Sequence, residues 1–214
     1  KKVSILVGIC TCANAEKKRE TMRKTWMAQS VAGIECRFFL GRREALEREE
    51  DAIPLWVNDD DDHLPEKVLA FFRYALEYYD FDWLFKCDDN TYVALDRLAE
   101  LADDQYDLIG DSSLKAKGAP SGRAGYFLSR SMVENIVAYS DIPSTGAENL
   151  IFGELVQRLG ARTLASDRLN MNTTPYPMKD DDVVTARWSP PEHFQGTENF
   201  RDFFPVTVYE GRHA

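Results

Sequence analysis

The chain has 214 residues, of which 44% are hydrophobic and 12% aromatic, enough to bury one sizeable core. Its formal net charge of −10 argues against non-specific binding of nucleic acid, which needs a basic surface. The apolar runs are too short to span a bilayer, and no signal peptide is visible. We therefore expect a single domain, with no nucleic-acid partner and no transmembrane segment in this chain.

The four cysteines are too few for a disulfide scaffold. Cys10 and Cys12 share a face of a predicted strand but lack the C-x-x-C spacing of zinc sites. We interpret them as buried free thiols, and an oxidised pair involving Cys36 or Cys87 stays open.

Strands and helices alternate along the first half of the chain. Residues 2–12 are a near-continuous apolar run rich in β-branched side chains, which is typical of a strand buried on both faces. Residues 66–80 carry apolar side chains at helical spacing, and Pro65 suits the first turn of that helix. The other elements predicted here are a helix at 13–29, strands at 34–41 and 52–58, a short charged helix at 43–51, an acidic turn at 59–63 and a strand at 81–89.

The second half continues this alternation and then loses it. From Asn170 the chain is rich in proline, aspartate and aromatic residues, and we expect a tail that wraps back over the fold with a few short strands. The order of elements predicts an α/β fold with a mostly parallel sheet. The elements predicted before the tail are helices at 94–102, 130–140 and 146–160, strands at 106–111 and 161–166, and a glycine-rich segment at 117–129 that leads into a short strand.

The stretch LFKCDDNTYV places Asp88, Asp89 and Asn90 at the end of a predicted buried strand. Ligands of parallel α/β sheets bind beyond the carboxyl ends of the strands, so these side chains are expected in a cleft. Asp88 and Asn90 point the same way on an extended segment and can reach one hard cation, such as Mg²⁺ or Mn²⁺. A solvated surface turn is the competing interpretation.

Four blocks occur in order along the chain: RETMRKTW, WVNDDDDHLPEKVLAFFRYALEYYDFDWLFKCDDNTYV, SGRAGYFLSR and GAENLIFGELVQRLGA. They resemble the motifs R-x-T-W, W-x-x-K-x-D-D-D-T-Y-V, S-G-G-A-G-Y-x-L-S and G-A-E-D-x-x-x-G of the β-1,3-glycosyltransferase superfamily. This superfamily includes the Fringe enzymes and the core 1 β-1,3-galactosyltransferases and is similar to glycosyltransferase family 31. The resemblance covers about residues 3 to 165 and is loose after about 170.

The resemblance implies a GT-A fold, with a Rossmann-like, mostly parallel sheet flanked by helices. It implies an inverting transferase that moves a hexose or N-acetylhexosamine from a UDP-sugar to a hydroxyl of a glycan or glycoconjugate, forming a β-1,3 linkage. In that interpretation residues 1–110 form the nucleotide-binding half, and residues 111–214 form the acceptor-side half and the tail. Relatives in eukaryotes act in the Golgi lumen, and a bacterial cytoplasmic or membrane-peripheral enzyme of polysaccharide biosynthesis is the other option.

The resemblance also assigns roles to single residues. Manganese, or magnesium, is implied at Asp88, Asp89 and Asn90, with His193 as an alternative ligand. The family's general base falls on Asn149, whose amide cannot accept the proton, so the neighbouring Glu148 is the candidate catalytic base. Residues implied at the donor site are Gly8, Thr11, Arg19, Arg23, Asp59, Lys86, Asp88, Gly122, Arg123, Gly125 and Arg187, and Lys67 is a further candidate for a cation that faces the phosphates. For Arg23 a salt bridge with an acidic neighbour, and for Lys67 a surface position on its helix, are equally good interpretations.

Three departures from the family pattern fall at the same expected site: Asn90, Asn149 and Arg187 replace acidic or metal-binding residues. We hypothesise that metal dependence is weak or absent, with Arg187, Arg123 or Lys86 supplying the positive charge. The alternative is a catalytically weakened nucleotide- or glycan-binding domain that kept the fold. A Ca²⁺-binding protein built on residues 59–62 and 180–182 is disfavoured, because no D-x-D-x-D-G loop is present.

Overall fold

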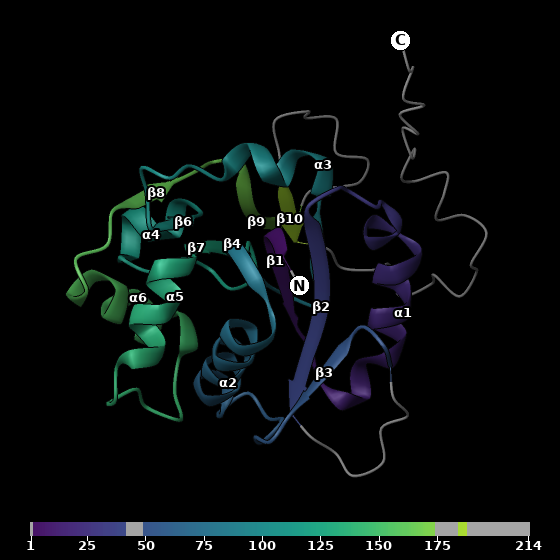
Figure 1. Cartoon of the computed structure of the whole chain (residues 1–214), viewed down its shortest axis with the longest axis horizontal. Coiled ribbons are helices and arrows are strands. Elements are labelled where there is room, and N and C mark those ends of the chain that lie inside the picture. Colours follow the sequence, from purple (N-terminus) through teal and green to yellow (C-terminus); the bar gives the residue numbers. More distant parts are fainter. Residues whose placement is uncertain (1, 42–48, 174–183, 188–214) are drawn as a thin grey trace.

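The computed structural model describes residues 2–41, 49–173 and 184–187. Its elements lie in the predicted order (Figure 1). In chain order they are β1 (Lys2–Cys10), η1 (Ala13–Ala15), α1 (Glu16–Lys24), η2 (Trp26–Ala28), β2 (Ile34–Gly41), β3 (Ala52–Leu55), α2 (Leu64–Tyr78), β4 (Asp80–Asp88), β5 (Thr91–Val93), α3 (Leu95–Leu98), η3 (Ala99–Leu101), β6 (Leu108–Gly110), α4 (Ser112–Lys117), β7 (Tyr126–Ser129), α5 (Arg130–Ala138), α6 (Glu148–Arg158), β8 (Thr163–Ala165), β9 (Leu169–Thr173) and β10 (Thr185–Arg187).

A seven-stranded sheet with the order β3-β2-β1-β4-β7-β6-β8 forms the centre of the molecule. Strands β3, β2, β1 and β4 are parallel to one another, β8 is parallel to β6, and β7 runs antiparallel to both of its neighbours. The predicted mostly parallel α/β fold is therefore confirmed. A smaller sheet, β5-β10-β9, pairs Arg187 of β10 with Thr91, the residue after Asn90.

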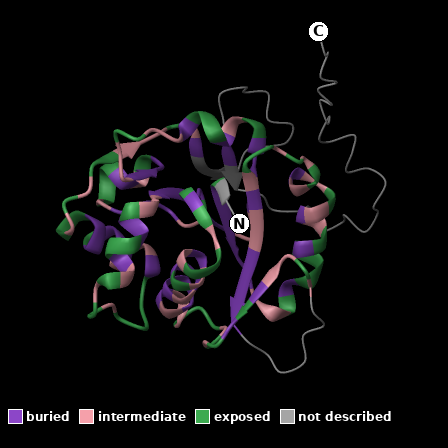
Figure 2. Ribbon diagram, in the orientation of Figure 1, coloured by how far each residue is buried: buried purple, intermediate pink, exposed green. Residues whose placement is uncertain are grey.

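Strand β1 is buried on both faces, as its apolar run predicted, and Figure 2 shows it within the buried interior. Leu6 lies in one core cluster, on the side of α2, α5 and α6. Ile5, Val7 and Ile9 lie in a second cluster on the opposite side, together with Trp26. Trp26 is 2% exposed, which confirms its predicted place in the core.

Helix α2 packs very closely on the sheet. Phe71 stacks on Phe39 of β2 with ring centroids 4.2 Å apart. A side chain at Gly8 would place its Cβ 2.2 Å from the Phe71 ring, so a glycine in mid-strand is what lets the helix approach. Gly8 is thus a packing residue of the interior in this structure. Lys67 is 4% exposed, which excludes the surface position, one of the two interpretations that its sequence allowed.

The other differences from the predictions are local. The helix expected at 13–29 is divided into η1, α1 and η2, because Thr25 takes a non-helical backbone and its hydroxyl donates to the Thr21 carbonyl. Helix α4 and strand β5 were not predicted. Most of the expected charged helix at 43–51 lies outside the described residues.

The four cysteines are free thiols. Among the described residues, no helix is long and apolar enough to cross a membrane.

Candidate functional site

The carboxyl ends of the two central strands lie side by side. Cys10 at the end of β1 pairs with Asp88 at the end of β4, and the amide of Asp89 donates to the Cys10 carbonyl at 3.0 Å. The acidic residues therefore emerge at the sheet edge where ligands of parallel α/β folds bind.

Lys86 is a completely buried cation between two carboxylates. Its Nζ lies 2.8 Å from Asp88 Oδ1 and 3.5 Å from Glu148 Oε2. Burial on its own lowers the pKa of Lys86, but the two carboxylates outweigh it and hold the pKa well above its ordinary value. One ammonium between two carboxylates leaves a net negative charge at this corner, which favours binding of a proton or a further cation.

Glu148, the first residue of α6, is oriented by a tyrosine. The Tyr126 hydroxyl donates to Glu148 Oε1 at 2.5 Å, and Glu148 is 4% exposed. Burial and the neighbouring Glu148 raise the pKa of Tyr126 well above its ordinary value, so it remains a proton donor in this bond. Asn149 instead lines a small hollow with Tyr126, Phe152 and Val156, and no hydrogen bond or ion pair joins it to Lys86 or Asp88 among the described residues. The structure thus brings Glu148, and not Asn149, to the acidic strand end.

Gly122 packs closely against this corner. A Cβ at Gly122 would lie 2.9 Å from Lys86 Nζ and 3.5 Å from both Asp88 Oδ2 and Glu148 Oε2. The absence of a side chain therefore lets the main chain approach the point where three charged groups converge. We call Lys86, Asp88, Glu148 and Gly122 the charged corner.

The rest of the glycine-rich segment shapes the approach to the charged corner. Gly125 has a φ of +80°, and a Cβ there would lie 2.2 Å from the Phe85 ring, so this position requires glycine. Arg123 is exposed, and its carbonyl accepts a hydrogen bond from the Thr91 hydroxyl at 2.8 Å.

The predicted metal ligands are not equivalent. Both carboxylate oxygens of Asp89 are engaged, with the Thr11 hydroxyl at 2.9 Å and Lys18 Nζ at 2.8 Å. Asn90 Oδ1, in contrast, is buried and has no hydrogen-bond partner among the described residues. A buried acceptor of this kind is costly, so it fits an oxygen ligand for a hard cation. Asp88 has one oxygen on Lys86 and a second, Oδ2, toward Gly122.

Protein ligands for a metal are nevertheless few. Within the part of the chain that the structure describes, no group of three or more His, Cys, Asp or Glu side chains could hold a metal ion. His193 lies outside the described residues. Arg187 is described only in its backbone, which β10 places opposite Thr91.

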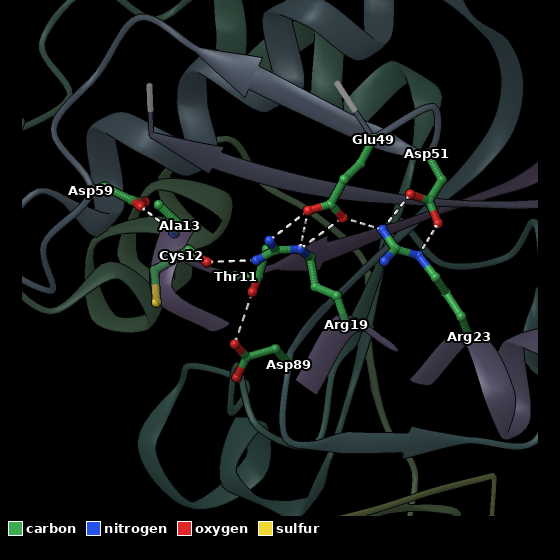
Figure 3. Close-up of polar contacts among 9 residues, drawn as sticks. All are labelled: Thr11, Cys12, Ala13, Arg19, Arg23, Glu49, Asp51, Asp59 and Asp89. Carbon is green, nitrogen blue, oxygen red and sulfur yellow. Dashed lines mark hydrogen bonds and ion pairs between the residues drawn. The ribbon is translucent and has the colours of Figure 1, made fainter. Parts of the chain in front are cut away.

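Residues Thr11–Ala13, which follow β1 and which we call the β1 loop, are surrounded by charged side chains (Figure 3). Arg19 is fully buried; its Nη1 donates to the Cys12 carbonyl at 2.7 Å, and its Nε and Nη2 bind Glu49. Arg23 forms salt bridges with Glu49 and Asp51, one of the two interpretations that its sequence allowed. In this structure neither guanidinium points freely into a ligand site.

Asp59 is likewise engaged by the protein. Its Oδ2 accepts from the amide of Ala13 at 2.7 Å, and its Oδ1 accepts from the amide of Gly41 at 2.8 Å and from Lys67 Nζ at 3.0 Å. Lys67 Nζ also donates to the Thr11 carbonyl at 3.1 Å.

Sequence reasoning missed two residues of this edge, Tyr126 and Glu49. Tyr126 lies in the block SGRAGYFLSR, where the apolar pattern indicates a strand residue and nothing indicates a role for its hydroxyl. Glu49 belongs to a run of charged residues without periodicity, so nothing local distinguishes it from its neighbours.

The mostly parallel sheet with helices on its faces, and with acidic residues at the carboxyl ends of its central strands, is a GT-A glycosyltransferase fold. It aligns with the galactosyltransferase LgtC in complex with donor and acceptor sugar analogues at a TM-score of 0.50, with 15% identity, over 96% of this chain and 98% of that chain. It aligns with the glycosyltransferase GlyE of Streptococcus pneumoniae TIGR4 at a TM-score of 0.50, with 10% identity, over 78% and 46%. At such low identity these likenesses show the fold alone.

The galactosyltransferase family model matches residues 17–123, half of the chain, and the chain belongs to this family. It is 28% identical over 207 residues to the glycoprotein-N-acetylgalactosamine 3-beta-galactosyltransferase 1 of Xenopus laevis, covering 91% of this chain and 56% of that protein. It is 31% identical over 119 residues to the probable beta-1,3-galactosyltransferase 13 of Arabidopsis thaliana, covering 47% and 35%. The chain thus spans about half, or less, of the length of these relatives.

Proposed function

We propose that this domain transfers a hexose or N-acetylhexosamine from a UDP-sugar to a glycan hydroxyl with inversion, forming a β-1,3 linkage. Galactose is the first candidate, because the family and the relatives are named for its transfer. The observation that carries the proposal is the charged corner, where Lys86, Asp88 and Glu148 converge beside the missing side chain of Gly122.

In this proposal Glu148 is the general base. Its Oε1 is held by Tyr126, while its Oε2 lies on the side of Gly122 and Lys86. The acceptor oxygen attacks C1 of the donor sugar, the C1–O bond to the diphosphate breaks, and the acceptor proton passes to Glu148. UDP leaves with the bonding electron pair. Lys86 supplies a preorganised positive charge in a site shielded from water, where such charges are most effective.

A divalent cation, Mn²⁺ or Mg²⁺, belongs to the proposal as an optional partner. Asn90 Oδ1 and Asp88 would hold it, and it would neutralise charge on the departing diphosphate. Because these two residues provide a single formal negative charge, and Asp88 already shares it with Lys86, we propose that the cation binds weakly without the nucleotide.

The test is turnover of a panel of UDP-sugars with glycan acceptors, measured as released UDP, with added Mn²⁺ and with excess EDTA. Transfer of at least one sugar, and its loss in Glu148→Gln, is the expected result. Activity that EDTA abolishes and Mn²⁺ restores would show that the metal is essential. If the domain binds UDP but turns over no donor, the alternative holds, in which the fold is kept as a nucleotide-binding domain and catalysis is lost.

A further inference from the structure

The main chain of the β1 loop is held by charged groups from three separate parts of the chain. Lys67 of α2 donates to the Thr11 carbonyl at 3.1 Å, and Arg19 of α1 donates to the Cys12 carbonyl at 2.7 Å. Asp59, from the turn before α2, accepts from the Ala13 amide at 2.7 Å. Figure 3 shows that Arg19 and Asp59 reach the loop from different sides. Three successive residues are therefore each fixed by a charge-assisted hydrogen bond.

These charges are buried and are balanced within the protein. Arg19 is 0% exposed and Lys67 is 4% exposed. Glu49 balances Arg19, and Asp59 balances Lys67 with 3.0 Å between Asp59 Oδ1 and Nζ. Buried charges are stabilised only when they are paired and hydrogen-bonded, so shifting the loop would leave some of them without partners. The loop conformation is thus determined before any ligand arrives.

Asp59 is the residue that connects most of this arrangement. Besides Ala13 it binds the amide of Gly41, the last residue of β2, at 2.8 Å. A Cβ at Gly41 would lie 2.6 Å from the Asp59 side chain and 2.8 Å from its backbone, so glycine is needed for this approach. One carboxylate therefore joins the carboxyl ends of β1 and β2 to the cation on α2.

We propose that Asp59 is a positioning residue of the nucleotide site, which acts by holding the β1 loop and does not itself contact the nucleotide. This inference rests on the proposed function, in which UDP binds at the carboxyl end of β1. Two amides and Lys67 occupy three of the roughly four lone-pair sites of the Asp59 carboxylate, and Oδ1 already accepts two of these bonds. The bonds shown for Asp59 therefore go to the protein's own main chain and to Lys67. In this inference the place that the resemblance implied for Asp59 at the donor site becomes this indirect role.

The test compares Asp59→Asn with Asp60→Asn. In Asp59→Asn one of the two backbone amides must face an NH₂ group, whichever way the amide is turned. Asp60 is the matched control, because it is the neighbouring acid, is exposed, and binds His63 and the backbone of Asp62 within the same turn. Two quantities are measured: hydrogen exchange of the Ala13 amide in the ligand-free protein, and the Kd of UDP by calorimetry.

In Asp59→Asn we expect faster exchange at Ala13 and roughly tenfold weaker UDP binding, because the competent loop conformation is less populated. Where activity is measurable, KM for the donor should rise more than kcat falls. Asp60→Asn should match the wild type in both quantities. Lys67→Met leaves both amide bonds of Asp59 in place, so it should change the exchange rate and the Kd in the same direction but by less. If Asp59→Asn does not fold, Lys67→Met replaces it in the test.

Weaker UDP binding with unchanged exchange at Ala13 would mean that Asp59 contacts the nucleotide directly, and would overturn the inference. So would a variant that matches the wild type in both quantities. If the wild type itself fails to bind UDP, the proposed function fails, and the Ala13 exchange still decides whether Asp59 holds the loop.

Discussion

The β1 loop and the charged corner lie at the same sheet edge but use their charges in opposite ways. Around the β1 loop, Arg19, Asp59 and Lys67 direct their charges onto main-chain groups and onto each other. At the charged corner, the charged ends of Lys86, Asp88 and Glu148 converge on one another beside Gly122. The first region fixes a shape, and the second keeps reactive groups close together.

This difference separates positioning from chemistry. A change near the β1 loop should act on folding and on nucleotide affinity, whereas a change in the charged corner should act first on turnover. The two halves expected from the sequence meet here, since Lys86 and Asp88 come from the first half and Gly122 and Glu148 from the second. That division of the chain stays a prediction.

The largest effect is expected for Glu148→Gln. Glutamine keeps an acceptor for Tyr126 but cannot take the acceptor proton, so kcat should fall by roughly 10²–10⁴. Donor KM should change little. The matched control is Glu154→Gln on the outer face of the same helix, where Glu154 pairs with Arg158. Steady-state rates of UDP release decide the question, and an unchanged kcat in Glu148→Gln would remove Glu148 as the base.

Lys86→Met should be the most destabilising change at the charged corner. It leaves the buried carboxylate of Glu148 and the partly exposed carboxylate of Asp88 without their cation, which costs roughly 3–5 kcal/mol of the free energy of unfolding. Lys18→Met is the control, because Lys18 is half exposed and its salt bridge with Asp89 contributes at most about 1 kcal/mol. Urea unfolding measures both. Equal losses in the two variants would contradict the distinction between buried and exposed cations.

Periodicity and strand ends were enough to predict the sheet, the long helix and the acidic edge. Lys86 and Asp88 were found because they sit at the end of an apolar run. The place of Lys67 could not be decided, because a stripe of apolar residues says nothing of a lysine in the first turn that donates to the Thr11 carbonyl. Glu49 was missed, since its partner Arg19 lies 30 residues away in the chain and only the fold brings them together.

Glu49→Gln tests how much the paired charges around the β1 loop contribute to stability. Hydrogen bonds from Arg19, and then from Arg23, outweigh partial burial and lower the pKa of Glu49 to about 2. Replacing Glu49 leaves the buried Arg19 without its counter-charge, so we expect a loss of roughly 1.5–3 kcal/mol in unfolding free energy at neutral pH. The exposed neighbour provides a control, Glu50→Gln, which should cost less than about 0.5 kcal/mol.

The pH dependence of this loss has a definite sign. Because the folded pKa lies below the ordinary value of 4.5, the contribution of Glu49 is complete above pH 4.5 and is lost as the pH falls toward 2. The difference in unfolding free energy between wild type and Glu49→Gln should therefore shrink over that interval. A difference that stays constant from pH 7 to pH 3 would show that the ionised carboxylate does not carry it.

The smallest effect is expected for Asn90→Asp, which tests whether the charged corner extends to a metal. Asn90 Oδ1 is a buried acceptor without a partner in the described part of the chain, so a carboxylate there adds charge where an oxygen already lacks a donor. Without metal the added charge should lower the unfolding temperature, and Mn²⁺ with UDP should restore it, because Mn²⁺ binds a carboxylate more tightly than an amide. We expect Mn²⁺ affinity in the presence of UDP to rise by roughly tenfold, which corresponds to about 1.4 kcal/mol.

Asn58→Asp, at an exposed position of the same residue type, should change neither the unfolding temperature nor the Mn²⁺ affinity. If Asn90→Asp binds Mn²⁺ no better than the wild type, Asn90 is not a ligand, and Lys86 remains the positive charge available to the diphosphate at this corner.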